Sequence, residues 1–489
     1  MSVARHTAYN VVGAIVPLAV SLVTVPIYLR IIGLDRYGIL AICWLLVGYF
    51  KLFDFGLGRA MAQKIATLAD APWEQRNRIF WTGGLLSLLL SGLAIGVFVP
   101  LGAIGLDHMK LSDAGLRQEV NIALPLLIAA VPFGVIQSLL VGALEGRREF
   151  LKLNLILSAG SIGTAVLPLL TAVLIDPQVS NLLAASLLAR LVVLMLLLGV
   201  CINSLPVRRL KIASSAEIRQ LLRFGGWTTV TNIVGPLLVF IDRFAIAAVL
   251  SAAAVALYVV PFNLVAQLTV LPAALAAALM PRLAAASDAE ASLVSADGLR
   301  VLTFFITPLT LAMIVGAGPF LTIWLGGAES VASIPVAYIL LLGFWSNALA
   351  RIPFVRLQAS GRPDLIAKAH LAELVPYIGL LYLGLYQFGI AGAALAWSAR
   401  TVADALILYV AANFDRRHLR TLLLHALVVI SAVAIAFTTP VWSPLRWVAL
   451  LSILILTLAV TLRNAPPQVG ETIITILRRT KRRPTTEPS

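Results

Sequence analysis

A small set of ionisable side chains interrupts the apolar stretches of this chain. They are Lys51, Asp54, Arg190, Asp242, Arg243, Arg351, Glu373, Arg400 and Asp404. If those stretches lie in lipid, each ionised group near the bilayer centre costs about 2.5–3.5 kcal/mol. A sum of that size is not tolerated against lipid, so we expect most of these groups to line a water-filled cavity or to pair with one another.

The basic members of this set are candidates to bind an anionic substrate: Arg190, Arg400, Lys51 and Arg243. Arg190 is the strongest candidate because no acidic residue lies within one helical turn of it. Arginine suits phosphate because its planar guanidinium forms two parallel hydrogen bonds with it.

The acidic members of this set could have either of two roles. Asp54 follows Lys51 by three residues, Asp404 follows Arg400 by four, and Asp242 precedes Arg243, so each could neutralise its neighbour and hold helices together. Together with Glu373, these carboxylates could instead couple transport to an ion. Arg351 lies near a predicted cytoplasmic end and could extend to the membrane surface.

The composition requires a membrane. Of the 489 residues, 60% are hydrophobic and only 12% are charged, against about 45–50% and 25% in soluble domains. The net charge of +15 is not gathered on a soluble segment, as nucleic-acid binding would require. The two cysteines, Cys43 and Cys201, lie in apolar runs and are expected to be small buried residues.

The apolar runs predict an all-α integral membrane protein with about fourteen transmembrane helices, since about 20 residues cross a bilayer. The predicted spans are 8–29, 38–57, 79–104, 122–144, 153–175, 182–205, 224–250, 255–279, 301–325, 334–354, 365–386, 390–413, 422–441 and 445–462. With both termini in the cytoplasm, the cytoplasmic segments hold most of the 37 Lys and Arg residues, as the positive-inside rule requires.

Three short stretches recur in order and predict an internal duplication. Gly146–Leu155 resembles Gly361–Leu371, Ser186–Val193 resembles Ala396–Ala403, and Asn10–Gly13 resembles Asn232–Gly235. We therefore expect two pseudo-symmetric six-helix lobes, with Arg190 and Arg400 at equivalent places facing a central cavity. The predicted domains are a lobe at 1–205, a cytoplasmic linker at 206–223, a second lobe at 224–413, an extra helix pair at 414–463 and a basic cytoplasmic tail at 464–489.

Motifs of other chemistries are missing from the sequence. It contains no Walker A loop, no dinucleotide-binding glycine motif and no zinc-ligand spacing, so we expect no cofactor and no metal. No long loop carries paired carboxylates either. These features disfavour an enzyme.

The N-terminal region resembles the polysaccharide and O-antigen flippases of the multidrug/oligosaccharidyl-lipid/polysaccharide exporter superfamily. The resemblance rests on "YNVVGAIVPLAVSLVTVPIYLRIIGLDRYGIL" followed by "FDFGLGRAMAQKIA", on "YVVPFNLVAQLTVLPAALAAALMPRLA", and on "LQASGRPDLIAKAHL". It covers about residues 1–413, and the N-terminal motif is the most specific of the three.

The resemblance implies a carrier of a lipid-linked oligosaccharide with an undecaprenyl diphosphate anchor, moving from the cytoplasmic to the outer leaflet of a bacterial inner membrane. The implied partners are that glycan, membrane lipids and a polysaccharide polymerase in the same membrane. Members often have a cationic cavity, and the lipid II flippases of the superfamily have an extra helix pair. The alternatives are an ion-coupled multidrug exporter, which predicts an acidic cavity, and a membrane polymerase or glycosyltransferase, which predicts a long outer loop.

Overall fold

The computed structural model describes residues 3–68, 71–205, 238 and 240–463. Within these residues the secondary structure is helical and no strand occurs. The chain divides into two compact units, Met1–Val260 and Pro261–Ser489. The prediction of an all-α membrane protein is confirmed. The predicted lobes at 1–205 and 224–413 stay a prediction, because the connecting residues 206–237 lie outside the described residues.

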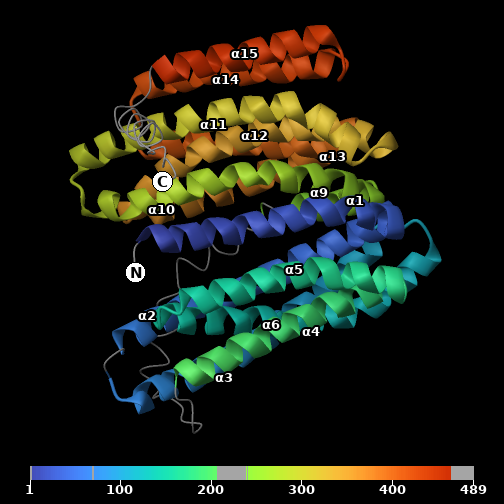
Figure 1. Cartoon of the computed structure of the whole chain (residues 1–489), viewed down its shortest axis with the longest axis vertical. Coiled ribbons are helices and arrows are strands. Elements are labelled where there is room, and N and C mark those ends of the chain that lie inside the picture. Colours follow the sequence, from blue (N-terminus) through green and yellow to red (C-terminus); the bar gives the residue numbers. More distant parts are fainter. Residues whose placement is uncertain (1–2, 69–70, 206–237, 239, 464–489) are drawn as a thin grey trace, which may run out of the picture. The chain divides into compact units, whose positions relative to one another are not determined.

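The N-terminal unit is a bundle of long helices (Figure 1). They are α1 (Val3–Tyr49), the 3-10 helix η1 (Phe50–Asp54), α2 (Leu57–Thr67), α3 (Trp73–His108), α4 (Ala114–Gly146), α5 (Phe150–Leu174) and α6 (Val179–Ser204), with α9 (Ala252–Val265) crossing the division. Helix α4 contacts α2, α3, η1 and α6, while α5 contacts α1 and α6. Helix α4 is therefore central to this unit.

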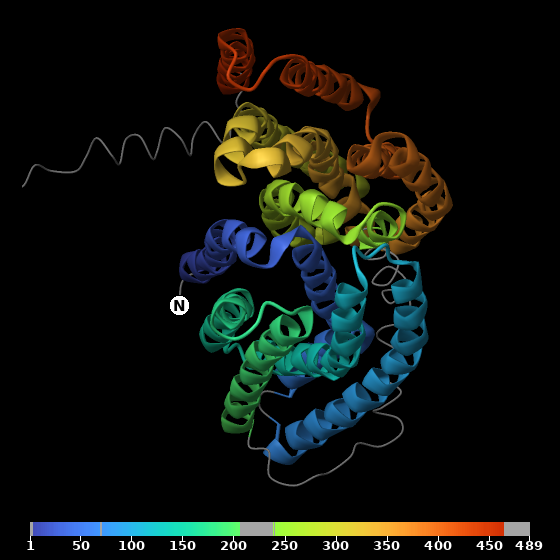
Figure 2. The same cartoon turned by 90° about the vertical axis from the view of Figure 1, so that its right-hand side faces the viewer.

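The described residues of the C-terminal unit form the 3-10 helix η2 and six long helices. They are η2 (Ala266–Thr269), α10 (Val270–Ala285), α11 (Asp288–Trp324), α12 (Gly327–Ala359), α13 (Pro363–Ala411), α14 (Arg416–Thr438) and α15 (Pro444–Arg463). Helix α12 contacts α10, α11, α13 and α14. The red pair α14 and α15 packs against α11, and both views show the two helices next to each other (Figures 1 and 2).

The number of membrane-spanning helices agrees with the sequence prediction if two of the long helices each cross the membrane twice. Among the residues that the structure describes, eleven helices are long and apolar enough to cross a membrane. Helix α1 has 47 residues and α13 has 49, about 70 Å each at 1.5 Å per residue, which is twice a bilayer core. Each bends at a left-handed glycine, Gly33 (φ 77°) or Gly389 (φ 57°), and Figure 2 shows the change of direction in the blue helix α1.

The glycine bends lie in the gaps between the predicted spans 8–29 and 38–57 and between 365–386 and 390–413. A further predicted span, 224–250, lies mostly outside the described residues, and its residues 240–249 are helical. The fourteen predicted spans are therefore compatible with the eleven long helices.

The first of the recurring stretches forms the same local structure twice. Helix α4 ends at Gly146, Arg148 adopts a left-handed conformation (φ 59°), and α5 begins two residues later. Helix α12 ends at Ala359, Gly361 is left-handed (φ 73°), and α13 begins two residues later at Pro363. Left-handed residues commonly end helices, so both stretches form helix–turn–helix connections of matching length.

Arg446 joins the last helix pair to the rest of the C-terminal unit. It lies in the first turn of α15 and is 1% exposed. Its guanidinium donates to the carbonyls of Ala436 (2.7 Å) and Thr439 (3.0 Å) and to the hydroxyl of Tyr338. The charge lies at the C-terminal end of α14, where the helix dipole favours a cation. Arg446 therefore fixes the α14–α15 pair to α12.

Candidate functional site: a cationic pocket in the N-terminal unit

A polar cavity opens among α1, η1, α4, α5 and α6. Its volume is about 420 Å³, which falls in the range of small-molecule sites. The polar side chains that line it are Lys51, Gln137, Ser138, Ser161, Thr164 and Arg190. Two of the four predicted substrate-binding cations thus meet in one cavity, and none of the described residues that line it is acidic.

Lys51 lies on a break between two helices, which the sequence did not predict. Helix α1 ends at Tyr49, η1 follows, and Phe55 and Gly56 both adopt left-handed conformations before α2 begins. The candidate membrane span ends at Asp54, so the predicted span 38–57 is three residues too long, and its residues 50–54 form a 3-10 helix. The break turns the chain and leaves Lys51 exposed at the cavity wall.

Asp54 stabilises this break instead of neutralising Lys51. Its carboxylate accepts hydrogen bonds from the backbone N–H of Gly56 (2.8 Å) and Gly58 (3.0 Å) and from the Ser138 hydroxyl (2.6 Å). An aspartate at the start of a helix satisfies N–H groups that have no partner within the helix. In the described part of the chain, no ion pair joins Asp54 to Lys51, so the lysine charge is available to the cavity.

Glycines let the cavity walls come close together. A Cβ on Gly134 of α4 would lie 2.9 Å from the backbone nitrogen of Lys51. A Cβ on Gly142 of α4 would lie 2.0 Å from the carbonyl oxygen of Gly58. Real side chains do not occupy such positions, so these two glycines set the spacing between α4 and the η1–α2 segment. Small residues are common at such helix contacts in membranes.

Arg190 enters the cavity from α6. Its Nε atom is buried and has no hydrogen-bond partner in the described residues, and the ion pairs found there do not include it. One turn earlier, Ser186 accepts a hydrogen bond from the Trp44 indole (2.9 Å), which links α6 to α1. A half-buried guanidinium with unused donors is suited to bind an anionic group.

Arg243 does not share this cavity. It is 2% exposed and pairs with the adjacent Asp242 at 2.6 Å, while Asp242 also accepts a hydrogen bond from the Tyr258 hydroxyl at 2.6 Å. The guanidinium lies 5.4 Å from the centre of the Tyr258 ring. The charge of Arg243 is thus compensated, and the geometry favours a structural role for Asp242 and Arg243.

Arg400 has a different partner from the one the sequence indicated. Its ion pair among the described residues is with Glu373 (3.3 Å), and Asp404 faces His370 (3.7 Å). The bend of α13 at Gly389 places residues of its first half beside those of its second half. Arg400 also lies over the Tyr377 ring, 5.4 Å from its centre. His370 and Tyr377 escaped the sequence analysis because spacing along one helix does not reveal contacts across a bend.

Arg190 and Arg400 lie in different units, which the structure describes separately. The predicted arrangement of the two arginines across a central cavity therefore stays a prediction. What the structure establishes is an asymmetry of charge. Lys51 and Arg190 line a cavity to which the described residues contribute no acidic side chain, whereas Arg400 of the C-terminal unit is buried with a carboxylate.

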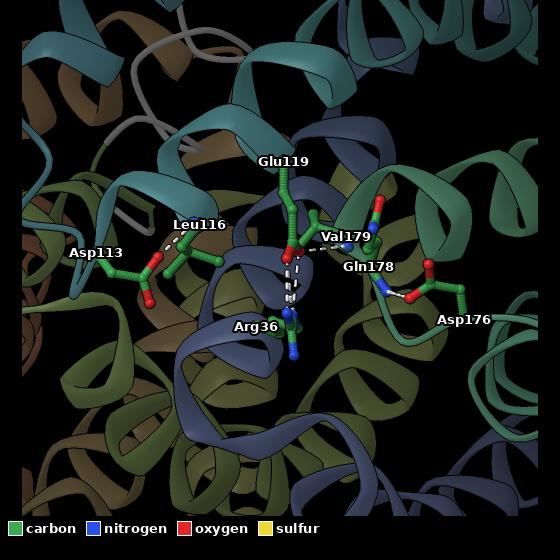
Figure 3. Close-up of polar contacts among 7 residues, drawn as sticks. All are labelled: Arg36, Asp113, Leu116, Glu119, Asp176, Gln178 and Val179. Atoms are coloured by element: carbon green, nitrogen blue, oxygen red, sulfur yellow. Dashed lines mark hydrogen bonds and ion pairs between the residues drawn. The ribbon is translucent and has the colours of Figure 1, made fainter.

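A second polar cluster joins α1, α4 and α6 at one end of the unit (Figure 3). Arg36 donates to both carboxylate oxygens of Glu119, with Nη2–Oε1 at 2.6 Å and Nε–Oε2 at 3.0 Å. The same carboxylate accepts the backbone N–H of Val179 at 3.0 Å. Glu119 and Gln137 lie on one helix, 18 residues or about 27 Å apart, so this cluster is separate from the cationic pocket.

The described residues contain no group of three or more His, Cys, Asp or Glu side chains arranged to hold a metal ion. The clusters that do occur are ion pairs and helix caps. The cavity in the N-terminal unit is of a size and charge that can bind a small anion.

The sequence comparisons match this chain to one protein family. The sequence profile of the polysaccharide biosynthesis protein family matches residues 3–287. A candidate O-antigen transporter of Shigella flexneri is 30% identical over 409 residues, which cover 83% of this chain and 97% of the relative.

Two groups of solved structures share the fold. An inward-facing multidrug resistance transporter of the MATE family aligns with a TM-score of 0.69 at 17% identity, covering 82% of this chain and 97% of its own. The lipid II flippase MurJ, in an inward closed conformation, aligns with a TM-score of 0.64 at 15% identity, covering 93% and 98%. The family profile and the 30% identical relative together show the family: this chain belongs to the polysaccharide biosynthesis protein family.

Proposed function

We propose that the protein moves an undecaprenyl-diphosphate-linked oligosaccharide from the cytoplasmic to the outer leaflet of a bacterial inner membrane. The observation that carries the proposal is the pocket holding Lys51 and Arg190 without an acidic side chain among its lining residues. A diphosphate joined to a lipid and a sugar carries two negative charges. Two cations match that charge and replace part of the water that the diphosphate loses on entering the protein.

The direction of transport follows from the same charge. A potential of 100 mV, negative inside, favours outward movement by about 2.3 kcal/mol for each negative charge. The two charges of the diphosphate would therefore gain about 4.6 kcal/mol when they cross. We infer that the pocket opens alternately to the two sides and delivers the glycan to a polymerase in the same membrane. Both termini are proposed to lie in the cytoplasm.

The same pocket argues against the alternative of a multidrug exporter. An exporter of organic cations needs acidic or aromatic groups at its binding site, whereas this cavity presents two cations and hydroxyl groups. The likeness to the multidrug transporter is a likeness of fold at 17% identity. The proposal therefore rests on the charge of the pocket and on the O-antigen transporter relative.

In a strain that lacks the gene, the lipid-linked glycan should accumulate on the cytoplasmic leaflet. The wild-type protein should remove the accumulation, and so should Arg300→Ala, which changes an exposed arginine on α11 that is paired with Asp297. Arg190→Glu should fail although the protein reaches the membrane. A strain without the gene that displays normal surface glycan and accumulates nothing would refute the proposal.

A further inference from the structure

Two chemically different kinds of polar group line the cationic pocket. Lys51 from η1 and Arg190 from α6 present only N–H donors. Helix α5 contributes the hydroxyls of Ser161 and Thr164, one turn apart. The N–H donors match the oxygens of a diphosphate, which act as acceptors. The hydroxyl groups require a different partner.

The hydroxyl groups on α5 already donate their protons to carbonyl groups of the same helix. Ser161 donates to the Leu157 carbonyl at 3.0 Å, and Thr164 donates to the carbonyls of Gly160 and Ser161, both at 3.0 Å. A hydroxyl that donates its single proton retains lone pairs and can only accept. The oxygens of Ser161 and Thr164 therefore offer acceptors to whatever occupies the cavity.

A third acceptor lies on the same helix. Residue 168 is a proline inside α5, and a proline has no N–H to donate to the carbonyl four residues earlier. That carbonyl belongs to Thr164, which lines the cavity. Gln137 on α4 adds to the cavity lining an amide that can both donate and accept.

Acceptor groups repel phosphate oxygens but match sugar hydroxyls, which are donors. The first sugar is bonded directly to the diphosphate, so it must lie next to the diphosphate in the same cavity. We propose that Ser161 and Thr164, together with Gln137, form a subsite for the first sugar and determine which sugars the protein accepts. The inference rests on the proposed function, because it assumes that Lys51 and Arg190 hold the diphosphate.

The test compares two probes on purified protein in lipid nanodiscs. One is a short-chain polyprenyl diphosphate without sugar, and the other is the same lipid carrying one hexose. Ser161→Ala and Thr164→Val should each weaken binding of the sugar-bearing lipid by about fivefold, the effect of one neutral hydrogen bond. Binding of the sugar-free lipid should stay within about twofold of the wild type.

Thr171→Val is the matched control. Thr171 also lies on α5, and its hydroxyl donates to the carbonyl four residues earlier at 3.0 Å, but it does not line the cavity. It should leave both affinities unchanged. A lipid-linked hexose that lacks one hydroxyl identifies the contact. The wild-type protein should bind this deoxy lipid more weakly than the lipid with the full hexose. The variant that has lost the matching acceptor should bind both lipids equally.

The outcomes separate the two proposals. If Ser161→Ala and Thr164→Val weaken both lipids equally, or neither, the sugar subsite is refuted while diphosphate binding stands. If the wild-type protein binds neither lipid, the proposed function fails, and the subsite fails with it.

Discussion

Removing the guanidinium of Arg190 should weaken binding of the anionic head group without unfolding the protein. Arg190 has no carboxylate partner among the described residues, so Arg190→Ala leaves no buried acid uncompensated. A hydrogen bond to a charged group contributes about 1.5–3 kcal/mol. Loss of one such contact corresponds to about a 10- to 150-fold weaker affinity for a polyprenyl diphosphate.

Two further substitutions at this position separate charge from shape. Arg190→Lys keeps the charge but loses the planar fork, so affinity should fall by roughly tenfold. Arg190→Glu should abolish binding, because a carboxylate repels the diphosphate. Lys51 is exposed, so water screens it, and Lys51→Ala should have a smaller effect than Arg190→Ala.

The assay is the dissociation constant of a fluorescent polyprenyl diphosphate for purified protein in nanodiscs, with Arg300→Ala as the control for loss of an exposed arginine. A melting curve of each variant reports on folding. If Arg190→Ala binds within about twofold of the wild type, Arg190 does not hold the head group and the assignment of the pocket is wrong.

Four other predictions follow from the polar contacts. Asp54→Ala leaves two backbone N–H groups without their acceptor, so it should lower the free energy of unfolding by about 2–4 kcal/mol, measured by melting curves. It should also slow transport, measured by glycan export. Glu119→Ala should destabilise by about 1–3 kcal/mol in the same melting assay, and Glu119→Gln by less, because the partner arginine is partly exposed. Arg400→Ala leaves the Glu373 carboxylate buried without its cation, so it should lower the free energy of unfolding by about 3–5 kcal/mol in the melting assay. Glu373→Gln in the same chain should largely restore both stability and glycan export. Failure to restore export would indicate that Arg400 acts on the substrate. A cysteine replacing Arg148, in a chain lacking the native cysteines, should react with a membrane-impermeant thiol reagent only after the cytoplasmic side is opened; labelling from outside would invert the predicted orientation.

The sequence was sufficient for the membrane class and the span count because hydrophobicity and the bias of positive charge are additive signals. It also singled out Arg190 and Lys51, which line one cavity, since an unpaired charge in an apolar stretch is costly wherever it lies. Their role in substrate binding stays a prediction. The residues between Phe50 and Gly56 were taken for helix because the apolar run continues through the break. Only the left-handed conformations of Phe55 and Gly56 reveal it.

The partner of Arg400 was missed for a different reason. Sequence spacing identifies neighbours on one helix, such as Asp404, but Glu373 becomes a neighbour only because α13 bends at Gly389. Ser161 and Thr164 were overlooked because hydroxyl side chains in membrane helices often bond back to their own helix. Their place at the cavity wall depends on how α5 packs against α1 and α6.

Transport in proteoliposomes tests the central claim most directly. The purified protein is reconstituted with a polyprenyl-diphosphate oligosaccharide confined to one leaflet, and a membrane-impermeant glycosidase reports when the glycan reaches the other. We predict that the wild-type protein moves the glycan, that a potential negative on the starting side accelerates the movement, and that Arg190→Glu abolishes it. Movement at the rate of protein-free liposomes, or movement that Arg190→Glu leaves unchanged, would contradict the account.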